Sequence, residues 1–173
     1  MRTQHLKLIG FIVTALIFPL AAAAQNSTFS DPNVEYTFAL PDQKWKMTSK
    51  PSATSPNVEF VYSDRLDGHF DVRKISPEKD ASLSDVIREE ENKLQFMQGF
   101  VAGKEEKFAG RLDGTVFNFE FVRSGRAMSG RYYFLRSGDL VYLLRFTGFR
   151  DKLRVIRNQT DSIARTFGIK EGE

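Results

Sequence analysis

The stretch that most constrains the fold runs from Phe117 to Phe146 and reads FNFEFVRSGRAMSGRYYFLRSGDLVYLLRF. Its first part alternates apolar and polar residues, whereas its later part is apolar at nearly every position. Successive side chains of a strand point to opposite faces, so a strand that is apolar throughout needs cover on both faces. The polar segments RSGR and RSGD separate the apolar runs and are typical of tight hairpins. We therefore predict an antiparallel meander in the middle of a sheet.

The second hairpin turn sets which side chains of the meander share a face. A turn at residues 137–138 would place Arg136 opposite Asp139 and Gly130 opposite Arg145. One face would then collect seven apolar side chains, namely Phe117, Phe119, Phe121, Tyr132, Phe134, Val141 and Leu143.

The first hairpin turn is predicted at residues 125–126. Glu120 would then lie opposite Arg131, and a turn shifted by one residue would keep the same faces. The predicted Glu120–Arg131 and Arg136–Asp139 pairs would neutralise charge within the sheet.

Two helical patterns flank the meander. Apolar residues recur at three- and four-residue steps between Leu83 and Gln98, with Ser82 placed to cap the first turn through Asp85. A second pattern runs from Phe149 to Phe167. We therefore expect the α+β class, with an antiparallel β-sheet covered by helices on both faces in an α/β/α sandwich.

Residues 1–24 have the order of a secretory signal peptide. The apolar run Leu8–Leu20 follows basic residues and precedes a run of alanines, so cleavage is expected after Ala24. The alternative is an uncleaved anchor, which would have to span the membrane with a short segment interrupted by Pro19. Cleavage predicts a periplasmic or secreted protein with no stable membrane anchor.

The rest of the chain is expected to divide into a flexible leader at residues 25–33 and a single domain at residues 34–170. After cleavage, 23 basic and 22 acidic residues remain, a net charge of +1. So small a charge does not favour a nucleic-acid partner. The charge is uneven, however, because residues 117–157 hold nine basic and three acidic residues, a net charge of +6.

Five arginines of this basic region are candidates for binding a protein partner. Arg123 and Arg126 crowd the tip of the first predicted hairpin, and Arg150, Arg154 and Arg157 share the polar face of the second predicted helix. The alternative is a solvated helix face with no partner, which is common for charged residues.

Arg145 is a different kind of candidate, because it falls in the apolar layer of the meander. A buried arginine without an acid is unfavourable, so Arg145 is either a structural ion pair or the lining of a ligand cleft. Tyr132 and Trp45 are the other candidates for that cleft. Trp45 is alternatively a lid on the sheet edge.

Catalytic and metal-binding patterns are scarce in the sequence. The chain has no cysteine, and His69 is the one histidine left after cleavage, so a hydrolase using His69 is a minor alternative. Asp64, Asp67 and Asp71 do not follow the spacing of a calcium loop and favour a turn. We expect no cofactor, no metal and no catalytic residue.

The order of these segments resembles the PsbP/Mog1-like superfamily. The segments are YTFALPDQKW, FVYSD followed by HFDVRKI, the mid-chain helix, the meander and the closing SIARTFGI, which together cover about Val34 to Ile169. The resemblance includes PsbP-related and DcrB-like bacterial exported proteins. It implies an antiparallel sheet between helices and a non-enzymatic accessory or assembly role in binding another protein. It carries no functional residue onto this chain, and the missing lipidation cysteine departs from DcrB-type lipoproteins.

We therefore expect an exported accessory or assembly protein that binds a protein partner in the cell envelope. The alternative is a carrier of a small ligand or lipid, with a cleft near Arg145.

Overall fold

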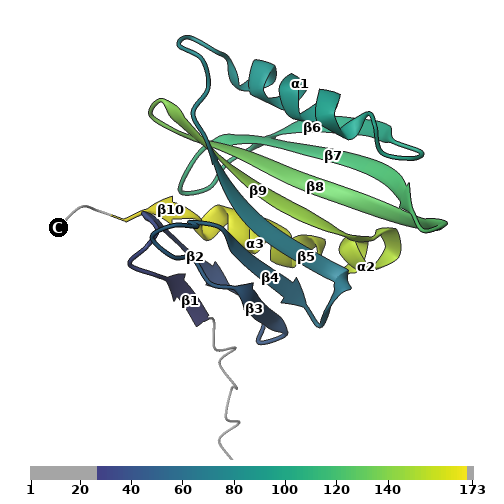
Figure 1. Ribbon diagram of the computed structural model, residues 1–173, viewed down its shortest axis with the longest axis horizontal. Coiled ribbons are helices and arrows are strands. Elements are labelled where there is room, and N and C mark those ends of the chain that lie inside the picture. Colours follow the sequence, from purple (N-terminus) through teal and green to yellow (C-terminus); the bar gives the residue numbers. More distant parts are fainter. Residues whose placement is uncertain (1–26, 171–173) are drawn as a thin grey trace, which may run out of the picture.

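The structure is a computed structural model that describes residues 27–170. This part of the chain forms strands and helices in an α+β arrangement (Figure 1). In chain order they are β1 (Ser27–Ser30), β2 (Tyr36–Leu40), β3 (Trp45–Ser49), β4 (Val58–Tyr62), β5 (Asp64–Ile75), α1 (Leu83–Leu94), β6 (Val101–Phe108), β7 (Gly114–Arg123), β8 (Arg126–Ser137), β9 (Leu140–Phe149), α2 (Arg150–Val155), α3 (Arg157–Thr166) and β10 (Gly168–Ile169).

Seven strands form one large antiparallel sheet in the order β3-β4-β5-β9-β8-β7-β6. The predicted meander supplies β7, β8 and β9, which lie inside this sheet with neighbours on both sides. A smaller sheet has the order β1-β2-β10. The prediction of a large antiparallel sheet in an α+β fold is confirmed.

The beginning of the described chain is more ordered than the sequence predicted. Residues 27–30 fall in the expected flexible leader, yet they form β1 and pair with β2, with Phe29 opposite Phe38. Phe29 is buried there, which explains why the segment is held in place. The predicted signal peptide at residues 1–24 lies outside the described residues. Within residues 27–170, no helix combines the length and apolarity that crossing a bilayer requires.

The meander has the predicted faces but a different register. The first turn lies at residues 124–125 and the second at residues 138–139, because Arg123 pairs with Arg126 and Ser137 pairs with Leu140. Each turn is thus one residue away from its predicted place. A one-residue move of a turn shifts the pairing by two and leaves every side chain on its predicted face.

The predicted cross-strand ion pairs are therefore wrong. Glu120 lies opposite Ser129, and Arg136 lies opposite Val141 instead of Asp139. Arg136 donates through Nη2 to the backbone oxygen of Ala81 at 2.8 Å.

One face of the large sheet packs against α1. Val86, Ile87 and Leu94 of this helix are buried in a cluster with the predicted apolar layer of β7, β8 and β9. The predicted capping box is present, since Ser82 and Asp85 bond each other's backbone N–H. The full cluster of buried residues is Val86, Ile87, Leu94, Phe117, Phe119, Phe121, Met128, Tyr132, Phe134, Val141 and Leu143.

Close packing in this cluster explains a glycine in the middle of β8. The ring of Phe119 lies directly over Gly130, and a Cβ at residue 130 would be 2.0 Å from the ring Cζ atom. The same ring meets Tyr132 edge-on, with 4.9 Å between the ring centroids. Gly130 therefore lets an aromatic side chain of β7 lie flat on β8.

The opposite face carries α2, α3 and the small sheet, which enclose the larger core cluster (Figure 1). The predicted second helix is divided here into α2 and α3 at Ile156, where φ is −94° and ψ is 13°. Leu153, Ile156 and Ile163 stay buried on both sides of the break. The expectation of helices covering both faces goes further than these contacts, because α1 lies mainly over β7 and β8 and strands share the second face with the helices.

Lys170 joins the two ends of the described chain. Its Nζ donates to the backbone oxygens of Asp31 at 2.6 Å and Val34 at 2.7 Å. β2 lies between β1 and β10, so residues from both ends complete the small sheet.

Candidate functional site

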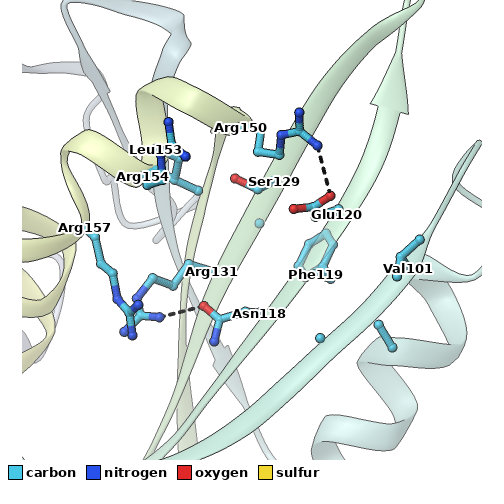
Figure 2. Close-up of a pocket in the computed structure, with 13 residues that line it drawn as sticks. Val101, Asn118, Phe119, Glu120, Ser129, Arg131, Arg150, Leu153, Arg154 and Arg157 are labelled. Atoms are coloured by element: carbon cyan, nitrogen blue, oxygen red, sulfur yellow. Dashed lines mark hydrogen bonds and ion pairs between the residues drawn. The ribbon is translucent and has the colours of Figure 1, made fainter.

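A pocket of about 610 Å³ lies between α2 and the strands β6, β7 and β8 (Figure 2). We call it the arginine pocket, because four arginines line it. Its lining residues are Val101, Ala102, Gly103, Asn118, Phe119, Glu120, Ser129, Gly130, Arg131, Arg150, Leu153, Arg154 and Arg157.

Alternation along β7 and β8 places polar side chains in this pocket. Asn118 lies opposite Arg131, and Glu120 lies opposite Ser129, on the face turned away from α1. Leu153 of α2 and Val101 of β6 supply apolar surface beside them. The side chains that β7 and β8 turn toward the pocket are therefore polar, although the opposite side of the same strands belongs to the α1 cluster.

Arg131 is buried in the sheet wall of the pocket, with 7% of its side chain exposed. Its guanidinium donates to the Tyr133 hydroxyl at 2.6 Å, to the Asn118 side-chain oxygen at 2.6 Å and to Asp161 Oδ1 at 2.7 Å. These partners come from β8, β7 and α3, so the network fixes the guanidinium and ties α3 to the sheet.

The charge on Arg131 is stabilised despite its burial. Burial opposes the charged form, but Tyr133 and Asp161 outweigh it, so the pKa of Arg131 lies above its ordinary value. Burial, aided by the bond to Asp161, also raises the pKa of Tyr133 above its ordinary value. The network thus contains a neutral phenol and a charged guanidinium at neutral pH.

The other three arginines of the pocket are largely exposed, at 52% for Arg150, 77% for Arg154 and 54% for Arg157. Each lies near an acid. The pairs are Arg150–Glu120 at 3.5 Å, Arg154–Asp151 at 3.4 Å and Arg157–Glu106 at 3.4 Å. Exposed pairs of this kind contribute about 0–1 kcal/mol, so another anion can replace these acids at little cost.

The structure separates the five predicted partner-binding arginines into two groups. Arg150, Arg154 and Arg157 line the arginine pocket, whereas Arg123 and Arg126 lie at the β7–β8 hairpin and do not. The Arg126 guanidinium lies over the Phe149 ring, 3.6 Å from its centroid. Arg126 and Arg150 together line a smaller neighbouring cavity of about 320 Å³.

Two of the three residues predicted to line a ligand cleft are neighbours, since Arg145 lies opposite Tyr132 with its guanidinium 6.0 Å from the ring centroid, whereas Trp45 belongs to the core cluster on the other face of the sheet. Arg145 forms an ion pair with Asp71, with 2.7 Å between Nη2 and Oδ1, which agrees with the structural alternative. Tyr132 is buried in the α1 cluster. Arg145, Tyr132 and Trp45 line neither the arginine pocket nor the smaller cavities beside Arg136 and Arg126.

Trp45 belongs to the core beneath the edge strand β3. It is 5% exposed, and its Nε1 donates to the side-chain oxygen of Gln159 at 3.0 Å. Its ring lies against Tyr62, Phe70 and Phe146. The position of Trp45 is therefore that of a lid on the sheet edge.

His69 lies between two carboxylates, outside the arginine pocket. Its Nε2 is 3.1 Å from Glu59 Oε2, and its Nδ1 is 3.7 Å from Asp71 Oδ2. Both ring nitrogens face acids, which leaves neither directed at a serine in the way that a hydrolase requires. Within residues 27–170, no group of histidine and acidic side chains has the arrangement of a metal site.

Sequence reasoning missed Arg131 as a member of the site and missed Asp161 altogether. Arg131 was predicted to pair with Glu120, whereas its acid comes from α3, thirty residues along the chain. The available indication was an arginine at an inward position of an otherwise apolar strand, which requires a buried partner.

No protein-family model matches the chain, and no curated protein matches it. Solved structures do match. The Ran-binding protein Mog1p of Saccharomyces cerevisiae is 10% identical, with 85% of this chain and 96% of that chain covered and a TM-score of 0.61. The cyanobacterial PsbP (CyanoP) of Synechocystis sp. PCC 6803 is 14% identical, with 87% and 95% covered and a TM-score of 0.58. The chain has the PsbP/Mog1-like fold.

A third structure similar to this chain is that of LpqN, a protein involved in cell envelope biogenesis of Mycobacterium tuberculosis. It is 15% identical, with 85% of this chain and 86% of that chain covered and a TM-score of 0.53. At such identities the likeness concerns the fold alone. The PsbP/Mog1-like resemblance expected from the sequence is thereby confirmed, and the use of the arginine pocket has to be argued from its own chemistry.

Proposed function

We propose that this PsbP/Mog1-like protein is a non-enzymatic accessory protein that binds an acidic segment of a protein partner in its arginine pocket. The observation that carries the proposal is the gathering of Arg131, Arg150, Arg154 and Arg157 around one cavity that contains a single lining carboxylate, Glu120. Guanidinium groups bind carboxylates through paired hydrogen bonds, so this lining favours an acidic occupant.

The three exposed arginines of the pocket can exchange their present acids for those of a protein partner. Arg150, Arg154 and Arg157 hold their present acids only through exposed contacts of 3.4–3.5 Å. A partner that buries these arginines removes water from them and strengthens each charge-assisted bond. Binding energy can thus come from charges that contribute little to the stability of the free protein.

The lining chemistry supports binding more than catalysis. Ser129 is the one hydroxyl residue among the lining residues of the pocket, and histidine, lysine and cysteine are missing from that lining. A nucleophile needs a neighbouring base, and Glu120 is occupied by Arg150. Mog1p is a Ran-binding protein, which supports a protein partner, and LpqN is involved in cell envelope biogenesis, which supports a role in the envelope.

Export to the periplasm or the medium is part of the proposal, and it depends on the sequence of residues 1–24. An exported chain would meet its partner in the cell envelope, without a lipid anchor because the sequence has no cysteine.

The proposal is tested by crosslinking in the native cells followed by identification of the captured proteins. A variant with Arg150, Arg154 and Arg157 each changed to glutamate should lose a captured protein that the unchanged protein retains. The matched control changes Lys46, Lys79 and Lys107 to glutamate, which alters the net charge equally at exposed positions outside the pocket. Equal capture by both variants would exclude the arginine pocket as the binding surface.

A small acidic ligand is the second candidate, and the size of the pocket favours it. A volume of about 610 Å³ falls within the range of small-molecule pockets, roughly 300–1,000 Å³. In this case the carrier site moves from the region of Arg145 to the arginine pocket. Native mass spectrometry of protein purified from its own host should then show a retained anion that is lost in the triple arginine variant.

A further inference from the structure

The arginine pocket has two chemically different ends. Figure 2 shows Glu120 and Arg150 paired at one end, and Arg131, Arg157 and Asn118 gathered at the other. Glu120, the single lining carboxylate, is thus at the Arg150 end. The acids that pair with Arg131 and Arg157 do not belong to the lining of the pocket.

Arg131 has unused hydrogen-bonding capacity at its end of the pocket. An arginine side chain carries five N–H donors, and three of those on Arg131 are bonded within residues 27–170. The remaining two donors are on Nη1 and Nη2, because Nε donates to Tyr133. Since Arg131 is already buried and fixed, an incoming anion would not have to order this side chain.

Arg157 can add a second guanidinium at the same end. Its one recorded acid is Glu106 of β6, at 3.4 Å, with both side chains about half exposed. That long, exposed contact is weak, so a better-placed carboxylate can displace Glu106.

We propose that the Arg131–Arg157 end of the arginine pocket is a carboxylate subsite, which binds an aspartate or glutamate side chain of the acidic partner segment. The segment extends from there toward Arg150, past the exposed apolar side chain of Val101. This inference rests on the proposed function and adds to it the group that is recognised and the direction in which the segment lies.

The spread of the arginines favours acidic side chains over a chain terminus. Arg150 and Arg154 belong to α2, and Arg157 begins α3, so positive groups border the pocket along its length. A single terminal carboxylate would satisfy one end only. A segment with acids spaced along it would engage Arg131 and Arg157 at one end and Arg154 further along.

The apolar surface between the ends predicts an apolar residue between the acids. Val101 is 61% exposed, a large fraction for a valine in a strand, and Leu153 lies across the pocket from it. Covering Val101 would remove apolar area from water. The recognised pattern is therefore acidic, apolar, acidic.

Short peptides titrated into the purified protein test the subsite. The probes are acetyl-Glu-Ala-Leu-Glu-amide, its counterpart with glutamine in place of both glutamates, the glutamine peptide with a free terminal carboxylate, and inorganic phosphate. The readout is the nitrogen–proton NMR signal of Arg131 Nε, together with the dissociation constant. We expect the glutamate peptide to shift this signal and to bind about tenfold more tightly than either glutamine peptide, as lost charge-assisted bonds imply.

Variants separate the subsite from general attraction to positive charge. Arg157→Gln should weaken binding of the glutamate peptide by about fivefold, whereas Arg123→Gln, which removes the same charge outside the pocket, should leave the affinity unchanged. Arg131→Lys keeps the charge but loses the planar fork and should weaken binding by about tenfold. Thermal melting shows whether the Arg131→Lys variant is folded. If that variant is unfolded, the test depends on Arg157→Gln, which changes an exposed position.

Each outcome supports or overturns the carboxylate subsite. Equal binding of both amide peptides, preference for the terminal carboxylate, equal binding of phosphate, or equal effects of Arg157→Gln and Arg123→Gln would overturn it. A protein captured in cells through the pocket, combined with no response to the glutamate peptide, would reject the subsite and keep the proposed function. Binding of the glutamate peptide, combined with no pocket-dependent partner in cells, would keep the subsite and reject the proposed function.

Discussion

Arg131 of β8 and Asp161 of α3 form a largely buried ion pair, with 2.7 Å between Nη2 and Oδ1. We expect Asp161→Ala to lower the free energy of unfolding by about 1–3 kcal/mol, because it leaves a buried guanidinium without its acid. The remaining bonds to Tyr133 and Asn118 limit the loss. Denaturant titration measures the change.

An exposed ion pair of the same composition serves as the control. Asp151 and Arg154 are each 77% exposed, so Asp151→Ala should change the unfolding free energy by no more than about 0.5 kcal/mol. If both alanine variants lose equal stability, the Arg131–Asp161 pair is not the fixed element of the pocket wall.

Gly130→Ala should destabilise the protein through a collision with Phe119. The added Cβ would lie 2.0 Å from a ring that is packed against Tyr132, so the ring has to move, at a cost of about 1–3 kcal/mol. Replacing Phe119 with leucine in the Gly130→Ala background should return part of that stability. If the double variant Phe119→Leu/Gly130→Ala loses more unfolding free energy than the two single variants lose together, the collision with Phe119 is not the cause.

Glu59 should make the stability of the protein depend on pH in the acidic range. The hydrogen bond with His69, helped by Arg65, lowers the pKa of Glu59 below its ordinary value of 4.5. A lowered pKa in the folded state gives stability that is complete above pH 4.5 and is lost as the pH falls through the folded value. Melting temperatures at a series of pH values below about 5 should therefore fall less in Glu59→Gln than in the unchanged protein. The control is Glu78→Gln, at an exposed loop position, whose melting temperature should fall with pH as that of the unchanged protein does.

Expression with its own amino terminus in a Gram-negative bacterium should yield a periplasmic protein that begins at Gln25, as mass spectrometry can establish. Leu16→Arg interrupts the apolar run and should keep the precursor in the cytoplasm. Thr3→Arg adds the same charge before the run and should leave export intact. Recovery of the full-length chain in the membrane fraction would favour the uncleaved anchor instead.

The faces of the sheet could be predicted from the sequence, but the exact pairing could not. Which face a side chain occupies depends only on alternation along its strand, so Tyr132 was assigned correctly to one face, and its neighbour Tyr133 lies in the cluster on the other. Pairing depends on the turn. Ser124 takes a positive φ of 51° beside Gly125, a backbone conformation that is uncommon for serine. The first turn was therefore predicted one residue too late.

The break between α2 and α3 and the acid of Arg131 could not be predicted for a similar reason. Leu153 and Ile156 keep helical spacing with Ile163 across the break, so the apolar pattern reads as one helix. Asp161 meets Arg131 only after α3 has packed on the sheet. The positions of Arg150, Arg154 and Arg157 on one side were predictable because they depend on local periodicity, whereas the cavity beside them depends on tertiary packing.

Lys170, which donates to the backbone oxygens of Asp31 and Val34, also bears on the order in which the protein folds. β2 pairs with β1 on one side and with β10 on the other, so the small sheet is incomplete until residues 168–170 reach β2. Segments from both ends of the described residues must therefore come together before this sheet is complete, which closes a long loop and places the step late in folding.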